Sequence, residues 1–440
     1  MLIRRSIDIR VTSATLSIAL GQSKLFQVED RVFTEQRLRL YGSGLLVAYG
    51  LALIWALFQG RFLIDQDGLP ACIDFSWMWV SGKFAASSTP VDAYDYSIFS
   101  ALRVALVGPV SCILDHFDYP PILMFLTYPL SFMPYLVAFP VWVAITFLLY
   151  GSSIYAIIPR PAAVIVAATP CVVLVNIQYG HNGFLTAGLI GLALTLMERR
   201  SGISGMVLGL LTYKPQFGLL LPGALLASRN WRVFFCATAA VAALGLSAAA
   251  LFGYEAWPSF FRTLIHRDAN LMLDERLVMT FQSPFGLLRW TRARASVGWV
   301  GHLAAAVVVF LSVCAIWTKP VPHAVKAAAV CIGSVMVTPY VLPWDLCILA
   351  VAVAFLVKDG LQHGFLPGER LVMLACWLGL FLLLTRTGPV GPVIDAILLL
   401  VVWRRVAAHE RGQFPLFTPV AGCDEAGKPT DGGTTAGVSA

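Results

Sequence analysis

The stretch SGISGMVLGLLTYKPQFGLLLPGALLA, residues 201–227, decides the class of fold. It is apolar and long enough to cross a bilayer core of about 30 Å, but Tyr213-Lys214-Pro215-Gln216 interrupts it. A lysine at the centre of a membrane helix costs at least about 2.5 kcal/mol, and a proline leaves a backbone carbonyl without its helical partner. Broken helices of this kind persist where they line a polar cavity. The stretch therefore predicts a membrane protein with a polar site inside it.

Apolar segments recur along the whole chain. Of 440 residues, 58% are hydrophobic and 12% are charged, about half of the charged fraction of a soluble domain. We therefore expect an all-α polytopic membrane protein with roughly ten full spans, each near the 20 residues that a membrane helix needs. Residues 119–135 and 201–227 are expected to be half-inserted or broken helices. The expected full spans are residues 40–58, 136–158, 162–178, 181–197, 233–252, 298–317, 322–340, 341–357, 370–386 and 389–403.

The basic residues set the expected orientation. Lys and Arg gather in the short loops, as they do on the cytoplasmic side of membrane proteins. The net charge of +7 is explained by these loops and indicates no nucleic-acid partner. The rule places residues 1–38 and 406–440 in the cytoplasm as tails, the second of them disordered. Residues 39–405 form the expected membrane domain, whose two long loops, 59–118 and 253–297, are exported.

The first exported loop contains IDFSWMWVSGKFAASSTPVDAYDY, residues 73–96. In it, Asp74 follows an apolar residue and precedes Trp77 and Trp79. A carboxylate held among aromatic rings at a membrane surface is a suitable place for chemistry on a lipid-borne substrate. Two simpler interpretations stay open, with Asp74 as a helix N-cap and the tryptophans as an interfacial aromatic belt.

Four stretches carry a family resemblance: DFSWMWVSGKFA (74–85), YPPILMFLTYPLSFMPY (119–135), GHNGFLTAGLIGLALTLMERRSGISGMVLGLLTYKPQFGLLLP (180–222) and TPYVLPWDL (338–346). Together they resemble glycosyltransferase family 87, the polyprenyl-phosphate-sugar-dependent mannosyltransferases of the GT-C superfamily. The third stretch is the most specific, because its Asn-Gly-Phe-Leu turn and its Lys-Pro-Gln break occur in the family's order and spacing. The resemblance covers about residues 39–405.

The resemblance implies a GT-C-type fold and an active site that opens to the periplasm of a bacterial inner membrane. It also implies that the sugar, expected to be mannose, passes from a polyprenyl phosphate to a lipid or glycan acceptor, with no metal or other cofactor. Asp74 matches the family's first-loop aspartate, expected to act as general base, and Lys214 matches the lysine of the helix break. The chain departs from some members near Trp344 and Asp345, where they have histidines and this sequence has none.

The chemistry of such a transfer indicates which other residues matter. A lipid phosphate is a good leaving group, so one carboxylate that takes the acceptor's hydroxyl proton suffices, without the second acid of a glycosidase. A direct displacement would invert the anomeric carbon. A cation must hold the phosphate as its charge develops, for which Lys214, Arg267, Arg276 and, more weakly, His266 are candidates. The candidates for substrate contact are Trp77, Trp79, Lys83, Tyr119, His181, Asn182, Gln216, Gln282, Tyr340 and Asp345.

Other functions and simpler roles stay open. A transporter or flippase of lipid-linked sugars would carry polar residues deep within several spans, whereas here they gather in exported loops, with Lys214 and Asp345 as the main exceptions. A lipid-linked glycan ligase or polymerase would share an outer-face site. Lys214 could also only snorkel toward the lipid headgroups, and His181 and Asn182 could belong to a plain solvated turn.

Nine cysteines form no Cys-x-x-Cys pair and show no zinc-binding spacing. Only Cys72 and Cys112 share the first exported loop, and the periplasm is an oxidising compartment. A disulfide between them is therefore a hypothesis. Closing a loop of about 40 residues would add roughly 4 kcal/mol of stability in the chain-entropy model.

Overall fold

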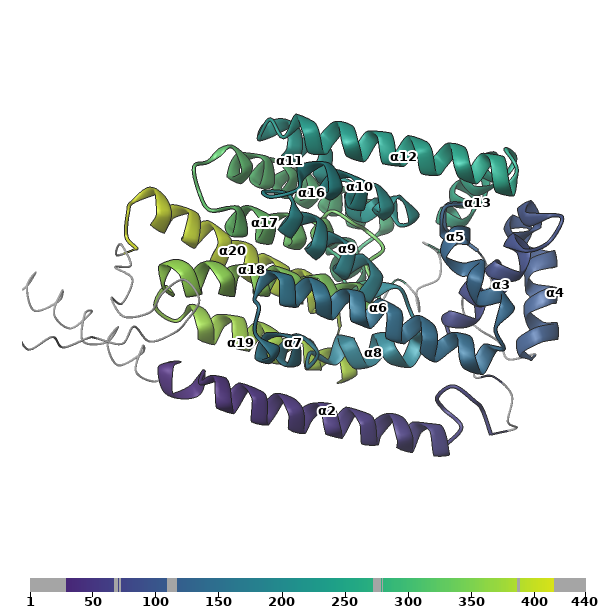
Figure 1. Cartoon of the computed structure of the whole chain (residues 1–440), viewed down its shortest axis with the longest axis horizontal. Helices are drawn as coiled ribbons and strands as arrows, with labels where there is room; N and C mark the ends of the chain where they lie inside the picture. The colour runs from purple at the N-terminus through teal and green to yellow at the C-terminus, as the bar shows by residue number, and fades with distance from the viewer. Residues whose placement is uncertain are drawn as a thin grey trace, which may run out of the picture.

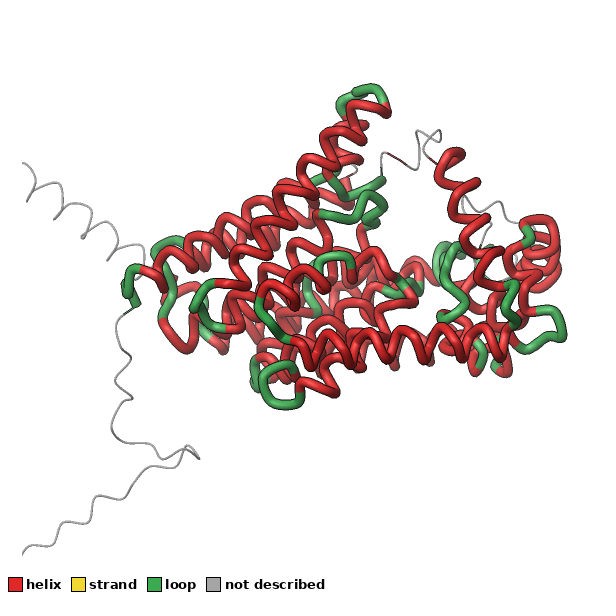
Figure 2. The backbone as a smooth tube through the Cα atoms, turned by 90° about the horizontal axis from the view of Figure 1, so that it is seen from above, coloured by secondary structure: helices red, strands yellow, loops and turns green. Residues whose placement is uncertain are grey.

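The computed structural model describes residues 29–66, 70, 73–108, 117–271, 278, 280–385 and 388–414, and the side chains of these residues except 266–271. Within these ranges the chain forms α-helices, short 3-10 helices and loops, and no β-strand (Figure 2). The predicted all-α class is confirmed for the described part of the chain.

Four helices have the length and composition to cross a membrane: α2 (Glu35–Phe58), α6 (Tyr135–Ile157), α12 (Trp231–Phe252) and α16 (Ala295–Thr318). At 22 to 24 residues and 1.5 Å per residue, each is about 33–36 Å long. Figure 1 shows α2, α6 and α12 running along the long axis of the molecule. Only 11% of the apolar window of α2, and of that of α12, is buried. Exposed apolar surface of this extent marks a lipid-facing or partner-facing side.

The span expected at residues 162–178 is not straight. Two short helices, α7 (Pro161–Ala167) and α8 (Cys171–Tyr179), occupy this part of the chain and are bent by 70° at their junction. Pro170 explains the bend, because proline donates no helical hydrogen bond and disfavours helical backbone at the residue before it. The pair makes a fifth span if its two halves cross the membrane together.

The other expected spans are shorter or less apolar helices, so the count of ten full spans stays a prediction. Proline and glycine divide some of these apolar segments into helices shorter than the roughly 20 residues of a full span. Charged residues make others less apolar. These helices are α9 (Gly183–Leu196), α17 (His323–Met336), α18 (Cys347–His363), α19 (Glu369–Gly379) and α20 (Gly391–Glu410). Helices α10 (Ser201–Leu210) and α11 (Leu221–Ala227) occupy the stretch that was predicted to be broken.

The break predicted at residues 213–216 is confirmed. Two 3-10 turns, Leu211–Tyr213 and Pro215–Gly218, lie between α10 and α11. Lys214 stands between the turns with φ −140° and ψ 69°, and it is 4% exposed. The proline after it ends the first turn, and the lysine is directed into the protein.

A group of shorter helices gathers at one end of the molecule (Figure 1). They are α3 (Phe75–Ala85), α4 (Tyr96–Val107), α5 (Leu123–Thr127) and α13 (Ala256–Leu271). Helix α3 is buried except for Lys83 and packs against α4 and α5. Helix α15 (Pro284–Trp290) packs against α16.

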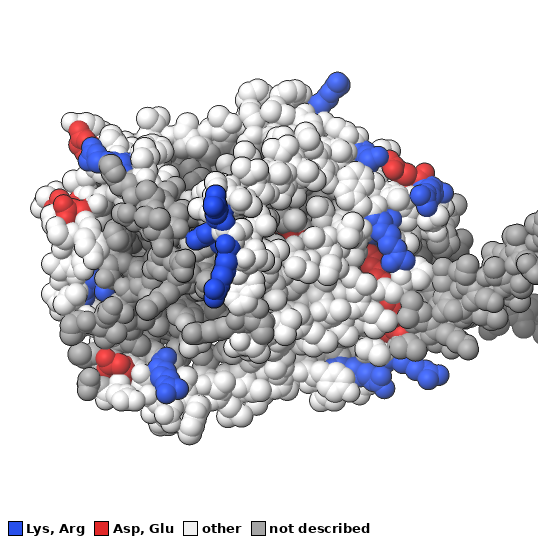
Figure 3. Space-filling view, turned by 180° about the vertical axis from the view of Figure 1, so that it is seen from behind, with Lys and Arg blue, Asp and Glu red and all other residues white. Residues whose placement is uncertain are grey.

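The start of α2 and the end of α20 lie at the opposite end of the molecule from α3 and α4 (Figure 1). Most of the face shown in Figure 3 carries no charge, and its charged side chains lie toward the two ends and in one basic group nearer the middle.

Candidate active site

Asp74 occupies the N-cap position of α3 but does not cap it. Its side chain makes no capping hydrogen bond, and its Oδ2 is buried with no hydrogen-bond partner among the described residues. A buried polar atom without a partner costs free energy, so helix capping does not explain this aspartate. The arrangement leaves the oxygen able to accept a hydrogen bond or a proton from a substrate.

Burial raises the pKa of the Asp74 carboxyl to about 7. Trp77 and the charge of Lys214 act against burial and lower this pKa, although the Trp77 indole N–H completes no hydrogen bond of normal geometry. A carboxylate that changes its charge near neutral pH is well suited to general-base catalysis.

Lys214 and Asp345 form a buried ion pair. Lys214 Nζ lies 2.5 Å from Asp345 Oδ1 and donates to Asn182 Oδ1 at 2.9 Å. The backbone N–H of Leu342 donates to Asp345 Oδ2 at 3.1 Å and fixes the carboxylate. The ammonium group therefore points into the protein and does not snorkel to the headgroups. It also lies close enough to Asp74 for the two charges to interact.

Aromatic side chains form one wall of this site. The rings of Trp77 and Tyr119 stack with centroids 5.3 Å apart, and the ring of Tyr213 lies parallel to that of Tyr119 at 6.5 Å. Asn182 Nδ2 donates to the Tyr119 hydroxyl at 2.9 Å. Asn182 thus joins the aromatic wall to Lys214, and the wall offers both ring faces and a hydroxyl to a sugar.

A histidine does reach the segment at Trp344 and Asp345, from elsewhere in the chain. The ring of His181 stacks on the indole of Trp344 with centroids 4.3 Å apart, and it lies edge-on to Trp77 at 5.8 Å. Its Nδ1 is buried without a hydrogen-bond partner in the described part of the chain. Five separate segments therefore meet at Asp74, Tyr119, His181, Lys214 and Asp345.

Comparison with protein families identifies the family of the chain. The sequence model of glycosyltransferase family 87 matches residues 117–343, just over half of the chain. The chain belongs to glycosyltransferase family 87. It is therefore an enzyme that transfers a sugar. Comparisons with curated proteins and with solved structures gave no match.

The match to family 87 covers only part of the site. Tyr119, Asn182 and Lys214 lie within the matched range, while Asp74 precedes it and Asp345 follows it. The ion pair of Lys214 with Asp345 and the interaction of Lys214 with Asp74 join these two outlying carboxylates to the family region. The roles of Asp74 and Asp345 in sugar transfer accordingly stay predictions.

A tight turn brings His181 and Asn182 to the site. Gly180 has φ +62°, a left-handed conformation that glycine adopts without steric cost. Helix α9 begins at Gly183, where a Cβ atom would lie 2.2 Å from the backbone carbonyl oxygen of Trp344. The close approach of the two backbones thus requires glycine at position 183.

Gly183→Ala is expected to push Trp344 and Asp345 away from the turn and to lower both stability and activity, since overpacking costs about 1–3 kcal/mol. The melting temperature and kcat/KM of the purified enzyme measure the two effects. Gly44→Ala is the matched control, because it lies in a helix with nothing within 4 Å of the added Cβ. If Gly183→Ala behaves like Gly44→Ala in both measurements, the close approach does not hold the site together.

Trp79 and Lys83 do not join the group around Asp74. The Trp79 indole donates to the Met133 carbonyl at 3.1 Å, and Lys83 Nζ donates to the Ser131 carbonyl at 2.5 Å. Trp77 and Trp79 are two residues apart, or about 200° around a helix axis, so their rings leave α3 on different sides. Of the three candidates on α3 (Trp77, Trp79 and Lys83), the structure brings only Trp77 to the site.

Gln282, Tyr340 and Gln216 lie in connecting segments and contact other parts of the chain. The side-chain amide of Gln282 accepts from the Gly391 N–H and donates to the Thr280 carbonyl, both at 3.1 Å. Gln282 therefore ties the segment before α15 to the start of α20. Tyr340 is half-buried beside the same loop, and Gln216 is half-buried in the break between α10 and α11. Substrate contact by these three residues stays a prediction.

Other predicted residues lie outside the described part of the chain. They are the side chains of His266 and Arg267 and the whole of Arg276, Cys72 and Cys112. Both the additional donor-phosphate cations and the disulfide therefore stay predictions.

Tyr213 and Trp344 also belong to this group but were not among the predicted site residues. The Tyr213 hydroxyl donates to the Asn182 carbonyl at 3.3 Å, and Trp344 carries the stacked His181 ring. Each directly precedes a predicted residue, Lys214 or Asp345. That adjacency was the only signal in the sequence, because an aromatic residue in an apolar segment is ordinarily part of the core.

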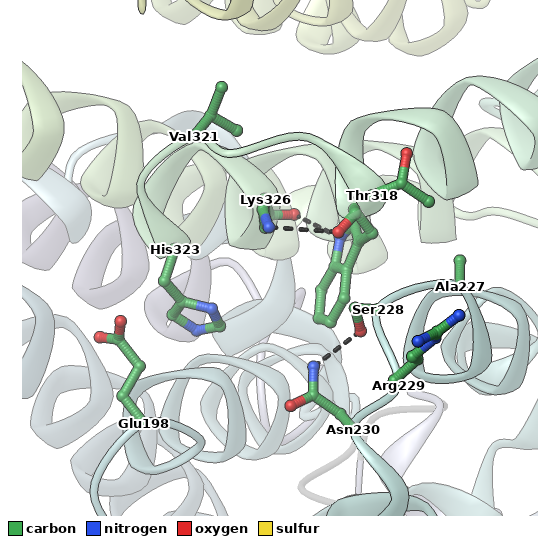
Figure 4. A pocket seen from close by; sticks show the side chains of 10 residues that line it. Glu198, Ala227, Ser228, Arg229, Asn230, Thr318, Val321, His323 and Lys326 are labelled. Carbon is green, nitrogen blue, oxygen red and sulfur yellow. Dashed lines mark hydrogen bonds between the residues drawn. The ribbon is translucent and has the colours of Figure 1, made fainter.

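A separate polar cavity of about 500 Å³ lies at the other end of α9 (Figure 4). Its lining includes Glu198, Arg229, His323 and Lys326. The 14 residues of α9, about 21 Å of helix, separate Glu198 from the turn at Asn182. None of the residues of the Asp74 group lines the cavity. The cavity and the Asp74 group are therefore two separate features of the structure.

Proposed function

We propose that this family 87 glycosyltransferase moves a hexose, expected to be mannose, from a polyprenyl-phosphate donor to a lipid or glycan acceptor. The observation that carries the proposal is the position of Asp74, whose buried oxygen has no partner in the described chain. It lies beside the Lys214–Asp345 ion pair and the stacked rings of Trp77 and Tyr119. The group thus combines a base, a cation and an aromatic wall.

In this mechanism the Asp74 carboxylate takes the proton of an acceptor hydroxyl as the acceptor oxygen bonds to the anomeric carbon of the sugar. The bond from that carbon to the phosphate oxygen breaks, and the lipid phosphate leaves with the electron pair. One displacement inverts the anomeric carbon. The leaving phosphate needs no proton, so no second carboxylic acid is required.

Lys214 is the proposed cation for the donor phosphate. An ammonium group held by Asp345 and Asn182 is positioned before the substrate binds, and such preorganised charge stabilises a developing anion. Because Asp345 already balances Lys214, a phosphate needs further positive charge. We propose that Arg267, Arg276 and His266 of the second exported loop supply it.

The proposed location is a bacterial inner membrane, with both termini in the cytoplasm and the Asp74 group facing the periplasm, among the membrane lipids that carry its donor. Single cysteines introduced at residues 59–118 or 255–297 are expected to react with a membrane-impermeant thiol reagent added from outside. Cysteines at 198–202, 229–232 or 405–440 are expected to stay unlabelled until the membrane is opened. Labelling of residues 198–200 from the periplasm would overturn this orientation.

The donor class is tested with purified enzyme in proteoliposomes. Labelled polyprenyl-phosphate mannose is compared with the corresponding nucleotide sugar, each with a membrane lipid extract as acceptor. We expect label to enter the acceptor only from the lipid phosphate. Transfer from the nucleotide sugar alone would refute the proposed donor. Movement of the intact donor across the bilayer without cleavage would favour a flippase, and transfer of an oligosaccharide unit would favour a ligase or polymerase.

A further inference from the structure

A second cluster of titratable residues lies at the opposite end of the molecule from Asp74, where α18 and α20 end. Asp359 of α18 is fully buried. Its Oδ1 lies 2.9 Å from Nδ1 of His363, one helical turn later, and its Oδ2 lies 3.0 Å from Nε2 of His409 of α20. One ligand atom of each of these three residues lies within 4.8 Å of the others. Two imidazoles thus converge on one carboxylate.

The charges around this carboxylate do not balance. Asp359, Glu369 and Glu29 are buried carboxylates. Arg405 pairs with Asp359 and Glu369, and Arg370 pairs with Glu29. Three buried negative charges therefore meet two guanidinium groups. A buried charge is costly unless it is paired, so the cluster needs one more positive charge, which either a protonated imidazole or a bound cation can supply.

The surroundings favour a metal ion. A ligating carboxylate in proteins is normally oriented by outer hydrogen bonds, and Arg405 provides them here while Glu369 holds the guanidinium at two atoms. The ring of Phe414 covers His409 with centroids 4.4 Å apart and closes one side. The His363 side chain is 38% exposed, which gives an ion a path from solvent.

We propose that Asp359, His363 and His409 bind a divalent transition-metal ion such as Zn²⁺, which joins the ends of α18 and α20. Two imidazole nitrogens and one carboxylate are a ligand set that Zn²⁺ accepts, with a further position left for water. The ion would replace the hydrogen bonds that the two imidazoles make to Asp359. The site is distinct from the proposed transfer site, and neither proposal depends on the other.

The test uses the full-length enzyme in detergent, purified without a polyhistidine tag and stripped with a chelator. Zn²⁺ binding is measured by competition with a chromophoric chelator, and metal content by elemental analysis. We expect one tightly bound Zn²⁺ per chain. His363→Gln and His409→Gln are each expected to weaken binding by about 100-fold or more, beyond the 10- to 100-fold cost of losing an outer partner. His323→Gln is the matched control and is expected to bind like wild type.

A melting-temperature measurement guards against a folding defect. Zn²⁺ is expected to raise the melting temperature of wild type and of His323→Gln, but not of the two cluster variants, because a ligand that binds only the folded state stabilises it. The proposal is overturned if wild type binds no Zn²⁺, or if both cluster variants bind Zn²⁺ as tightly as wild type.

Discussion

Asp74→Asn is expected to lower turnover by at least about 100-fold, the usual scale of general-base catalysis, while the protein still folds. Asparagine keeps the size of aspartate and its place at the start of α3, but it cannot take a proton at neutral pH. Turnover is measured with saturating lipid-phosphate donor, and folding by the melting temperature and gel-filtration profile. Turnover within a few-fold of wild type would remove Asp74 as the base.

Asp95→Asn is the matched control for this substitution. Asp95 lies between α3 and α4 and is exposed. Its carboxylate caps α4 by accepting from the backbone N–H groups of Ser97 and Ile98. Asparagine is as good an N-cap as aspartate. We therefore expect Asp95→Asn to leave both stability and turnover near those of wild type. A loss in both variants alike would point to the negative charge of the loop and not to a base.

Lys214→Met is expected to lower stability as well as activity. Breaking a buried ion pair from one side typically costs 3–5 kcal/mol, because Asp345 would then be a buried charge without its partner. The double variant Lys214→Met/Asp345→Asn removes both charges, so it is expected to recover most of the melting temperature. Its use of the lipid-phosphate donor is expected to stay poor, since the cation is absent.

Lys214→Arg completes this series. It keeps the positive charge, and we expect it to use the donor better than Lys214→Met but less well than wild type, because guanidinium and ammonium differ in shape and hydration. The KM for the donor is compared across the three variants. If the folded double variant shows the wild-type KM, the ion pair is structural and a different cation binds the phosphate.

Much of the site could be predicted because its residues interrupt apolar patterns. Lys214 stands in a membrane-like stretch with a proline after it, which signals a break and a polar surrounding. Asp74 stands among aromatic residues in a polar segment between apolar ones. Both signals are local in sequence, and the structure shows the break and the burial of Lys214 within it.

What could not be predicted depends on packing between distant segments. Sequence spacing does not show which face of α3 meets the site, so Trp77 and Trp79 are equivalent candidates in the sequence. The structure distinguishes them, because the Trp79 indole donates a hydrogen bond to the Met133 carbonyl. The stacking of His181 on Trp344 joins residues that lie far apart in the chain. The 70° bend within the span expected at residues 162–178 was not predicted, although Pro170 was visible in the apolar run.

The pH dependence of sugar transfer tests the central claim most directly. Wild-type enzyme is loaded with purified polyprenyl-phosphate mannose, and the single-turnover rate of transfer is measured between pH 5 and 9. Because Asp74 must be ionised to take a proton and burial raises its pKa to about 7, the rate is expected to rise about tenfold per pH unit below 7 and to level off above it. Asp74→Asn is expected to lack this rise. A wild-type rate that is independent of pH in this range, or the same rise in Asp74→Asn, would contradict the account.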